Sequence, residues 1–66
     1  MSILNIGQKI KEKRESKGLN QYQLSKSLKN LNQSQISKIE KGKRKVSAEE
    51  LFEITKVLGI PTEEFI

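Results

Sequence analysis

The stretch NQYQLSKSLKNLNQSQISKIEKG, residues 20–42, contains the same polar start twice. Asn20 is followed three residues later by Gln23, and Asn32 is followed in the same way by Gln35. Such a pair resembles a capping box, which satisfies the free backbone N–H groups at the beginning of a helix. Aliphatic residues at three- and four-residue spacing follow each pair, so the stretch predicts two short helices joined by a turn.

Helix signals also flank this pair on both sides. Before it, helical spacing of apolar residues predicts a helix over residues 5–17, which Gly18 ends. After it, Ser47 and Glu50 form the standard capping box of a fourth helix, and residues 61–66 form a last short turn. The sequence therefore predicts an all-α chain with five helical segments and no strand. The predicted core consists of Ile6, Ile10, Leu19, Leu24, Leu28, Leu31, Ile36, Ile39, Val46, Leu51, Ile54, Leu58 and Phe65.

The length and composition limit how such a chain can be stabilised. Its 66 residues predict one small domain spanning 1–66, and it contains no Cys and no His. No disulfide or ordinary metal site can therefore support the core, which must depend on packed aliphatic residues. No apolar run approaches the length of a membrane span, and the N-terminus lacks a signal-peptide pattern. We expect a cytoplasmic protein without a cofactor and without a membrane partner.

Charge is distributed unevenly along the chain. Residues 1–45 hold twelve Lys and Arg against three Glu, a net charge of +9, whereas residues 46–66 have a net charge of −4. A strongly basic region indicates a polyanionic partner such as nucleic acid. A solvated lysine-rich surface would show the same composition, so charge alone leaves both interpretations open.

The spacing of these residues resembles that of a known family. The segments IGQKIKEKRESKGLNQYQLSKSL and QSQISKIEKGKRKVSAEELFEITKVLGI are similar to the Cro/C1-type helix-turn-helix family, also called the XRE family. The resemblance covers Ile6 to Phe65. It implies a five-helix bundle of the phage-repressor type, with the helix-turn-helix in the second and third helices. It also implies that the third helix, residues 33–41, enters the major groove of double-stranded DNA.

Polar residues of the third segment are the candidates for reading bases. Gln33 and Ser34 lie in its first turn, and the amide of Gln33 can bind adenine at two points. Lys38 follows Ser34 by four residues and shares its face. We expect base contacts from Gln33, Ser34, Ser37 and Lys38.

A second set of residues is suited to the phosphate backbone. Gln21 begins the second segment, where free N–H groups attract anions, and it matches a phosphate-binding glutamine of the family. A run of cations follows the third segment, although a solvated basic loop would look the same. The predicted phosphate contacts are Gln21, Asn32, Lys41, Lys43, Arg44 and Lys45.

Two further features concern the position of the third helix. The resemblance implies an ion pair between Arg14 and Glu40, which we expect to orient this helix and to direct Arg14 toward DNA. The turn Lys29–Asn32 is one residue longer than is usual in the family and lacks glycine. Asn30 is therefore expected to adopt the left-handed conformation there.

The combined expectation is a transcriptional repressor that binds an inverted repeat as a homodimer. The predicted dimer interface consists of apolar residues near the acidic end: Phe52, Val57, Phe65 and Ile66. An enzyme is disfavoured because the chain lacks His, Cys and Asp, the usual nucleophiles, bases and metal ligands. The alternative is an antitoxin, or the DNA-binding head of a larger sensor, acting mainly through a protein partner.

Overall fold

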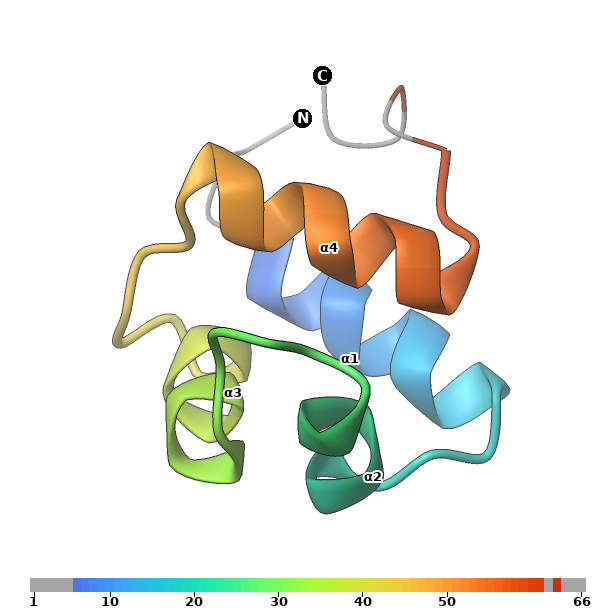
Figure 1. The fold of residues 1–66 in the computed structure, drawn as a ribbon, viewed down its shortest axis with the longest axis horizontal. Coiled ribbons are helices and arrows are strands. Elements are labelled where there is room, and N and C mark those ends of the chain that lie inside the picture. Colours follow the sequence, from blue (N-terminus) through green and yellow to red (C-terminus); the bar gives the residue numbers. More distant parts are fainter. Residues whose placement is uncertain (1–5, 62, 64–66) are drawn as a thin grey trace.

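Four α-helices make up the regular structure of residues 6–61 and 63, the part of the chain that the computed structural model describes (Figure 1). They are α1 (Ile6–Ser16), α2 (Gln21–Lys26), α3 (Gln33–Glu40) and α4 (Ala48–Leu58). Within these described residues there is no strand, which confirms the all-α prediction. The predicted last turn at 61–66 lies mostly outside them, so the count of five helices stays a prediction.

The last three helices begin at the residues that the sequence predicts. In each, the side chain of the N-cap residue, which directly precedes the helix, accepts a hydrogen bond from the backbone N–H three residues later. The side chain of that later residue accepts a hydrogen bond from the backbone N–H of the N-cap. The pairs are Asn20–Gln23, Asn32–Gln35 and Ser47–Glu50, with distances between 2.7 and 3.1 Å. These reciprocal bonds fix the first turn of each helix and confirm the predicted capping boxes.

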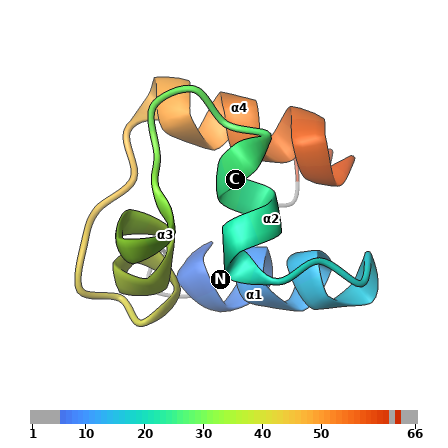
Figure 2. The same cartoon turned by 60° about the horizontal axis from the view of Figure 1, so that its bottom comes forward.

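The core lies where α1 packs against α3 and α4, and α2 packs against α3 (Figures 1 and 2). Its buried members are Ile10, Leu24, Leu28, Leu31, Ile36, Ile39, Ile54, Leu58 and Ile60. Eight of these nine were predicted from helical spacing, and Ile60 was not. Ile6, Leu19, Val46 and Leu51 are only partly buried against the cluster, and Phe65 lies outside the described residues.

The turn between α2 and α3 is held by its own side chains. Leu28 and Leu31 are buried in the core, and Asn30 Nδ2 donates to Glu53 Oε2 of α4 at 3.4 Å. Figure 2 shows the turn passing from α2 toward α3 beside α4. Among the described residues only glycines have a positive φ, so the prediction of a left-handed Asn30 is wrong.

A close approach between helices fixes the position of α3. Gly7 in the first turn of α1 lies against the backbone of Ile39, and a Cβ built on Gly7 would collide with the Ile39 carbonyl oxygen and lie 3.1 Å from the Cα of Glu40. Only glycine fits at this contact, because the neighbouring atoms are backbone atoms and cannot rotate away. The crossing of α1 and α3 therefore depends on the absence of a side chain at Gly7.

We expect Gly7→Ala to lower the free energy of unfolding by about 1–3 kcal/mol, as overpacking does, although alanine is the better helix former. Urea unfolding followed by circular dichroism measures this change. Gln8→Ala, at the adjacent exposed position, serves as the control and should cost much less. A Gly7→Ala chain as stable as the original would contradict the close packing.

Candidate nucleic-acid interface

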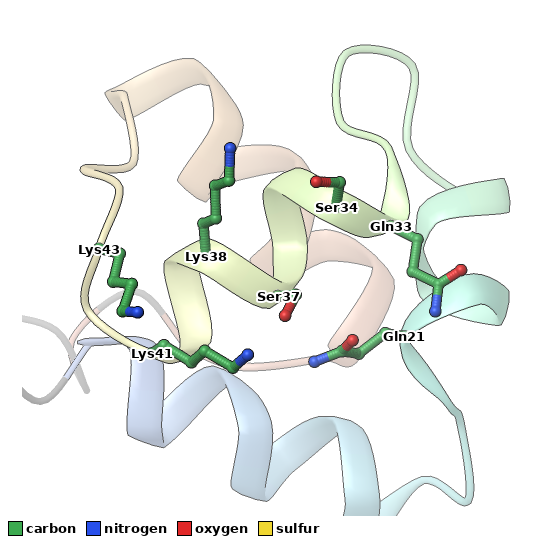
Figure 3. Close-up of a pocket in the computed structure, with 7 residues that line it drawn as sticks. All are labelled: Gln21, Gln33, Ser34, Ser37, Lys38, Lys41 and Lys43. Carbon is green, nitrogen blue, oxygen red and sulfur yellow. The ribbon is translucent and has the colours of Figure 1, made fainter.

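An open hollow on the surface collects most of the residues predicted to bind DNA (Figure 3). It measures about 460 Å³ and is lined by Gln21, Gln33, Ser34, Ser37, Lys38, Lys41 and Lys43. Every lining residue is polar or cationic, and none is acidic. The hollow thus contains all four predicted base-contact residues and three of the six predicted phosphate-contact residues.

The packing of α3 determines which of its side chains face this hollow. Ile36 and Ile39 are 1% and 3% exposed and fix one side of the helix against the core. Ser34, Ser37 and Lys38 lie at three- and four-residue spacing on the opposite side, so one face of α3 carries all three. Figure 3 shows these side chains along the outer surface of α3.

Side chains from outside α3 lie at both ends of this face. Figure 3 shows Gln21 of α2 beside Gln33, with Lys41 and Lys43 at the other end of α3. Both lysines are exposed, so their ammonium groups are available to an anionic partner such as a phosphate strand. The arrangement places the serine hydroxyls and Lys38 on the outer face of α3, Gln21 and Gln33 near its start and two further lysines at its end.

A buried ion pair joins α1 to the end of α3. Arg14 Nε and Nη2 donate to the Glu40 carboxylate at 2.7 and 3.1 Å, and Arg14 Nη1 donates to the carbonyl oxygen of Leu19 at 2.7 Å. The two side chains are only 8% and 3% exposed. The hydrogen bonds to Glu40 raise the pKa of Arg14 above its ordinary value, so the cation is retained. All guanidinium nitrogens are engaged inside the fold, so the expectation that Arg14 is directed toward DNA is not met.

Glu40 also binds a residue that the sequence did not connect to it. Gln21 Nε2 donates to Glu40 Oε1 at 2.9 Å, so a single carboxylate holds side chains from α1 and α2. The bond fixes the Gln21 amide where it lines the hollow. No local pattern indicates this contact, because the two residues are 19 positions apart.

The remaining predicted phosphate-contact residues lie elsewhere. Asn32 is exposed, but its side-chain oxygen is occupied by the backbone N–H of Gln35 at 2.8 Å. Lys45 is exposed and lines a separate cleft between α1 and the loop that follows α3. Neither lines the hollow. The structure therefore does not bring Asn32 or Lys45 into the hollow with the other predicted DNA-binding residues.

Arg44 forms an ion pair with α4. Its Nη1 and Nη2 atoms donate to the two carboxylate oxygens of Glu50 at 2.9 and 3.0 Å, the fork-to-fork geometry that favours arginine. Glu50 Oε1 also accepts from the backbone N–H of Ser47 at 3.0 Å. These hydrogen bonds lower the pKa of Glu50 from 4.5 to about 2, and the bonds from Arg44 have the largest effect. Arg44 is thus turned toward α4 and does not line the hollow.

Of the four residues predicted for a dimer interface, Phe52 and Val57 lie within the described part of the chain, and these two do not share one face of α4. Phe52 is 58% exposed, whereas Val57 packs against the core. Five residues along an α-helix correspond to a rotation of about 140°, so the two side chains leave α4 in different directions. Phe65 and Ile66 lie outside the described residues.

Comparison of the sequence with known protein families identifies a helix-turn-helix protein, in agreement with the arrangement of α2 and α3. A protein-family model described as helix-turn-helix matches residues 10–65, which is most of the chain. The chain therefore belongs to the Cro/C1-type helix-turn-helix family, the XRE family, whose members are DNA-binding transcription regulators and not typically enzymes. Neither the curated proteins nor the solved structures contained a match to this chain. No helix in residues 6–61 is both long enough and apolar enough to cross a membrane.

We expect Glu40→Ala to lower the free energy of unfolding by about 3–5 kcal/mol, because the buried Arg14 would keep only the exposed carboxylate of Glu15, 3.9 Å away, as a counter-charge. The same variant should weaken DNA binding, since Gln21 would lose its acceptor. Urea unfolding and titration with duplex DNA measure the two effects.

The double variant Arg14→Met/Glu40→Met serves as the control, because it removes both charges and keeps apolar volume. It should be more stable than Glu40→Ala alone. If Glu40→Ala left both the unfolding free energy and the DNA affinity unchanged, the ion pair would not have the role described.

Acid should weaken the link between the loop and α4. The folded-state pKa of Glu50 is about 2, below its ordinary 4.5, so its contribution to stability is complete above 4.5 and disappears as the pH falls toward 2. We expect Glu50→Gln to remove this part of the pH dependence while retaining the cap at Ser47. Melting temperatures measured between pH 2 and 6 test this, with Glu12→Gln on the exposed surface of α1 as the control. Parallel acid profiles for the original chain and Glu50→Gln would contradict it.

Proposed function

We propose that the chain is a cytoplasmic transcriptional repressor that binds an inverted-repeat operator as a homodimer. The observation that supports this function is the hollow in Figure 3, whose lining on and beside the outward face of α3 includes three lysines and no carboxylate. An α-helix fits the major groove of B-DNA, and the N-terminal turn of such a helix approaches the base edges. α3 is the recognition helix in this proposal.

The base-reading residues are the four on α3 that line the hollow: Gln33, Ser34, Ser37 and Lys38. Gln33 carries a donor and an acceptor on one planar group, which suits the N6 and N7 atoms of adenine. The serine hydroxyls donate or accept, and Lys38 donates to guanine or to a phosphate. Since Ile36 and Ile39 anchor the helix, these groups approach the groove from a fixed backbone.

Lysines at the end of α3 and in the following loop supply the affinity that is independent of sequence. Lys41, Lys43 and Lys45 are exposed and contact phosphates in this proposal, together with Gln21 and Asn32. Arg44 is left out of this set, because its guanidinium is bound to Glu50. The cations hold the duplex, and the amides and hydroxyls of α3 select the sequence.

A two-fold symmetric protein suits a two-fold symmetric site. A single recognition helix reads only a few base pairs, and two copies whose α3 helices lie one helical turn of DNA apart, about 34 Å, read both halves of an inverted repeat. Homodimers with this symmetry are the commonest closed assemblies. The proposed operator is therefore a pair of short half-sites in opposite orientation.

The second candidate is a regulator that acts mainly through another protein, as an antitoxin or as the DNA-binding head of a larger sensor. The exposed ring of Phe52 is the observation that favours a protein partner. A DNA-binding antitoxin would still use Gln33 and Ser34, whereas a module that binds protein alone would not. Loss of these two side chains separates the possibilities.

Selection of bound sequences from random duplex DNA tests base reading. We expect Gln33→Ala to change the preferred base at one position in each half-site, at a cost of about 1–3 kcal/mol for the original sequence. Binding of the selected duplex by both proteins, measured at one fixed salt concentration, gives the energy. An unchanged base preference after this substitution would exclude Gln33 as a reader.

Lys43→Ala provides the control for this selection. It should weaken binding to all duplexes by a similar factor and lower the salt dependence by about one counterion, without changing the preferred sequence. If Lys43→Ala altered the base preference instead, the division between the two sets of residues would be wrong.

A further inference from the structure

The exposed face of α4 carries three residues that no DNA-binding role accounts for. Glu49, Phe52 and Lys56 are all exposed, and the ring of Phe52 is 58% accessible. None of the three lines the hollow on α3. Covering the exposed ring of Phe52 with another molecule would remove apolar surface from water, which is favourable.

These residues form a continuous stripe. Glu49 precedes Phe52 by three positions and Lys56 follows it by four, so all three side chains leave the same face of α4. The ammonium group of Lys56 lies 5.2 Å from the centre of the Phe52 ring. Glu49 and Lys56 are seven residues apart, about 10 Å along the helix axis. The stripe therefore has a negative end, an aromatic centre and a positive end.

We propose that this stripe binds the same stripe of a second copy of the chain, with the two α4 helices antiparallel. The inference rests on the homodimer of the proposed function and identifies its contact surface. A two-fold axis that passes between residues 52 and 53 places Glu49 of each copy opposite Lys56 of the other. The two Phe52 rings then meet near the axis.

Charge complementarity favours a second copy as the occupant. In the antiparallel arrangement both pairs across the interface have opposite charges, and both are generated by one symmetry operation. A parallel arrangement would place Glu49 against Glu49 and Lys56 against Lys56, which is repulsive. The stripe is thus complementary to itself in one orientation and not in the other, which is the property that a closed dimer requires.

Phe52 supplies the apolar contact that the two charge pairs surround. Burial of an aromatic ring is worth far more than an exposed ion pair, and two rings that meet gain a further aromatic contact. Lys56 already lies over the ring of its own chain, so its ammonium is placed at the edge of the proposed contact. The ring gives most of the affinity, and the charges set the orientation.

Charge reversal tests the orientation, with sedimentation equilibrium of the 66-residue chain in the absence of DNA as the measurement. We expect a wild-type monomer–dimer equilibrium above 7.6 kDa, and Glu49→Lys or Lys56→Glu alone should each raise the dissociation constant about tenfold. The double variant Glu49→Lys/Lys56→Glu restores both pairs and should return the constant to within about threefold of the original. Phe52→Ala should weaken the dimer more than either single reversal.

Lys11→Glu, which makes the same change of charge on the exposed surface of α1, is the control and should leave the equilibrium unchanged. Thermal unfolding of each variant verifies that it is folded, because a lysine at position 49 is unfavourable in the first turn of α4. A wild-type chain that remains monomeric, single reversals without effect, or a double variant as weak as the singles would each overturn the proposal.

The two proposals fail in different ways. If the dissociation constant responds as expected but no duplex sequence is selected, the DNA-reading function is wrong and the α4 contact stands. If a sequence is selected and Gln33→Ala alters it while the charge reversals leave the dimer unchanged, the function stands and the contact surface is wrong.

Discussion

The carboxylate of Glu40 is the point at which three helices are joined. It belongs to α3, receives two hydrogen bonds from Arg14 of α1, and receives a third from Gln21 of α2. A buried carboxylate is costly unless its oxygens are satisfied and a counter-charge is present, and both conditions are met here. The orientation of α3 relative to α1 and α2 therefore depends on one buried carboxylate.

The same arrangement explains why the candidate interface can remain polar. The chain has no disulfide to support it, and its nine buried aliphatic residues supply the core within the described part of the structure. Gly7 brings α1 close to α3, and the two buried isoleucines of α3 occupy its inner side. Since packing is completed on that side, the outer side of α3 is free to carry amides, hydroxyls and ammonium groups.

Much of this fold was predictable because its signals are local. Each capping box lies within four consecutive residues, and the inward-facing residues repeat at helical spacing, so the starts of three helices and most of the core follow from the sequence. The gathering of the α3 residues on one surface follows for the same reason. The predicted left-handed Asn30 failed, because the packing of Leu28 and Leu31 and a bond to Glu53, none of them local in the sequence, shape that turn.

Contacts between distant positions were the least predictable. The bond from Gln21 to Glu40 and the pairing of Arg44 with Glu50 depend on how helices cross, and the residue types alone do not indicate them. The pairing of Arg44 with Glu50 also makes the loop after α3 less positively charged than its sequence indicates. Of three consecutive cations, the outer two remain accessible to solvent while the middle one is neutralised by its neighbour on α4. A tally of basic residues thus overstates the positive potential of this loop by one charge, and exchanging Lys43 with Arg44 would preserve the composition while altering the electrostatic surface.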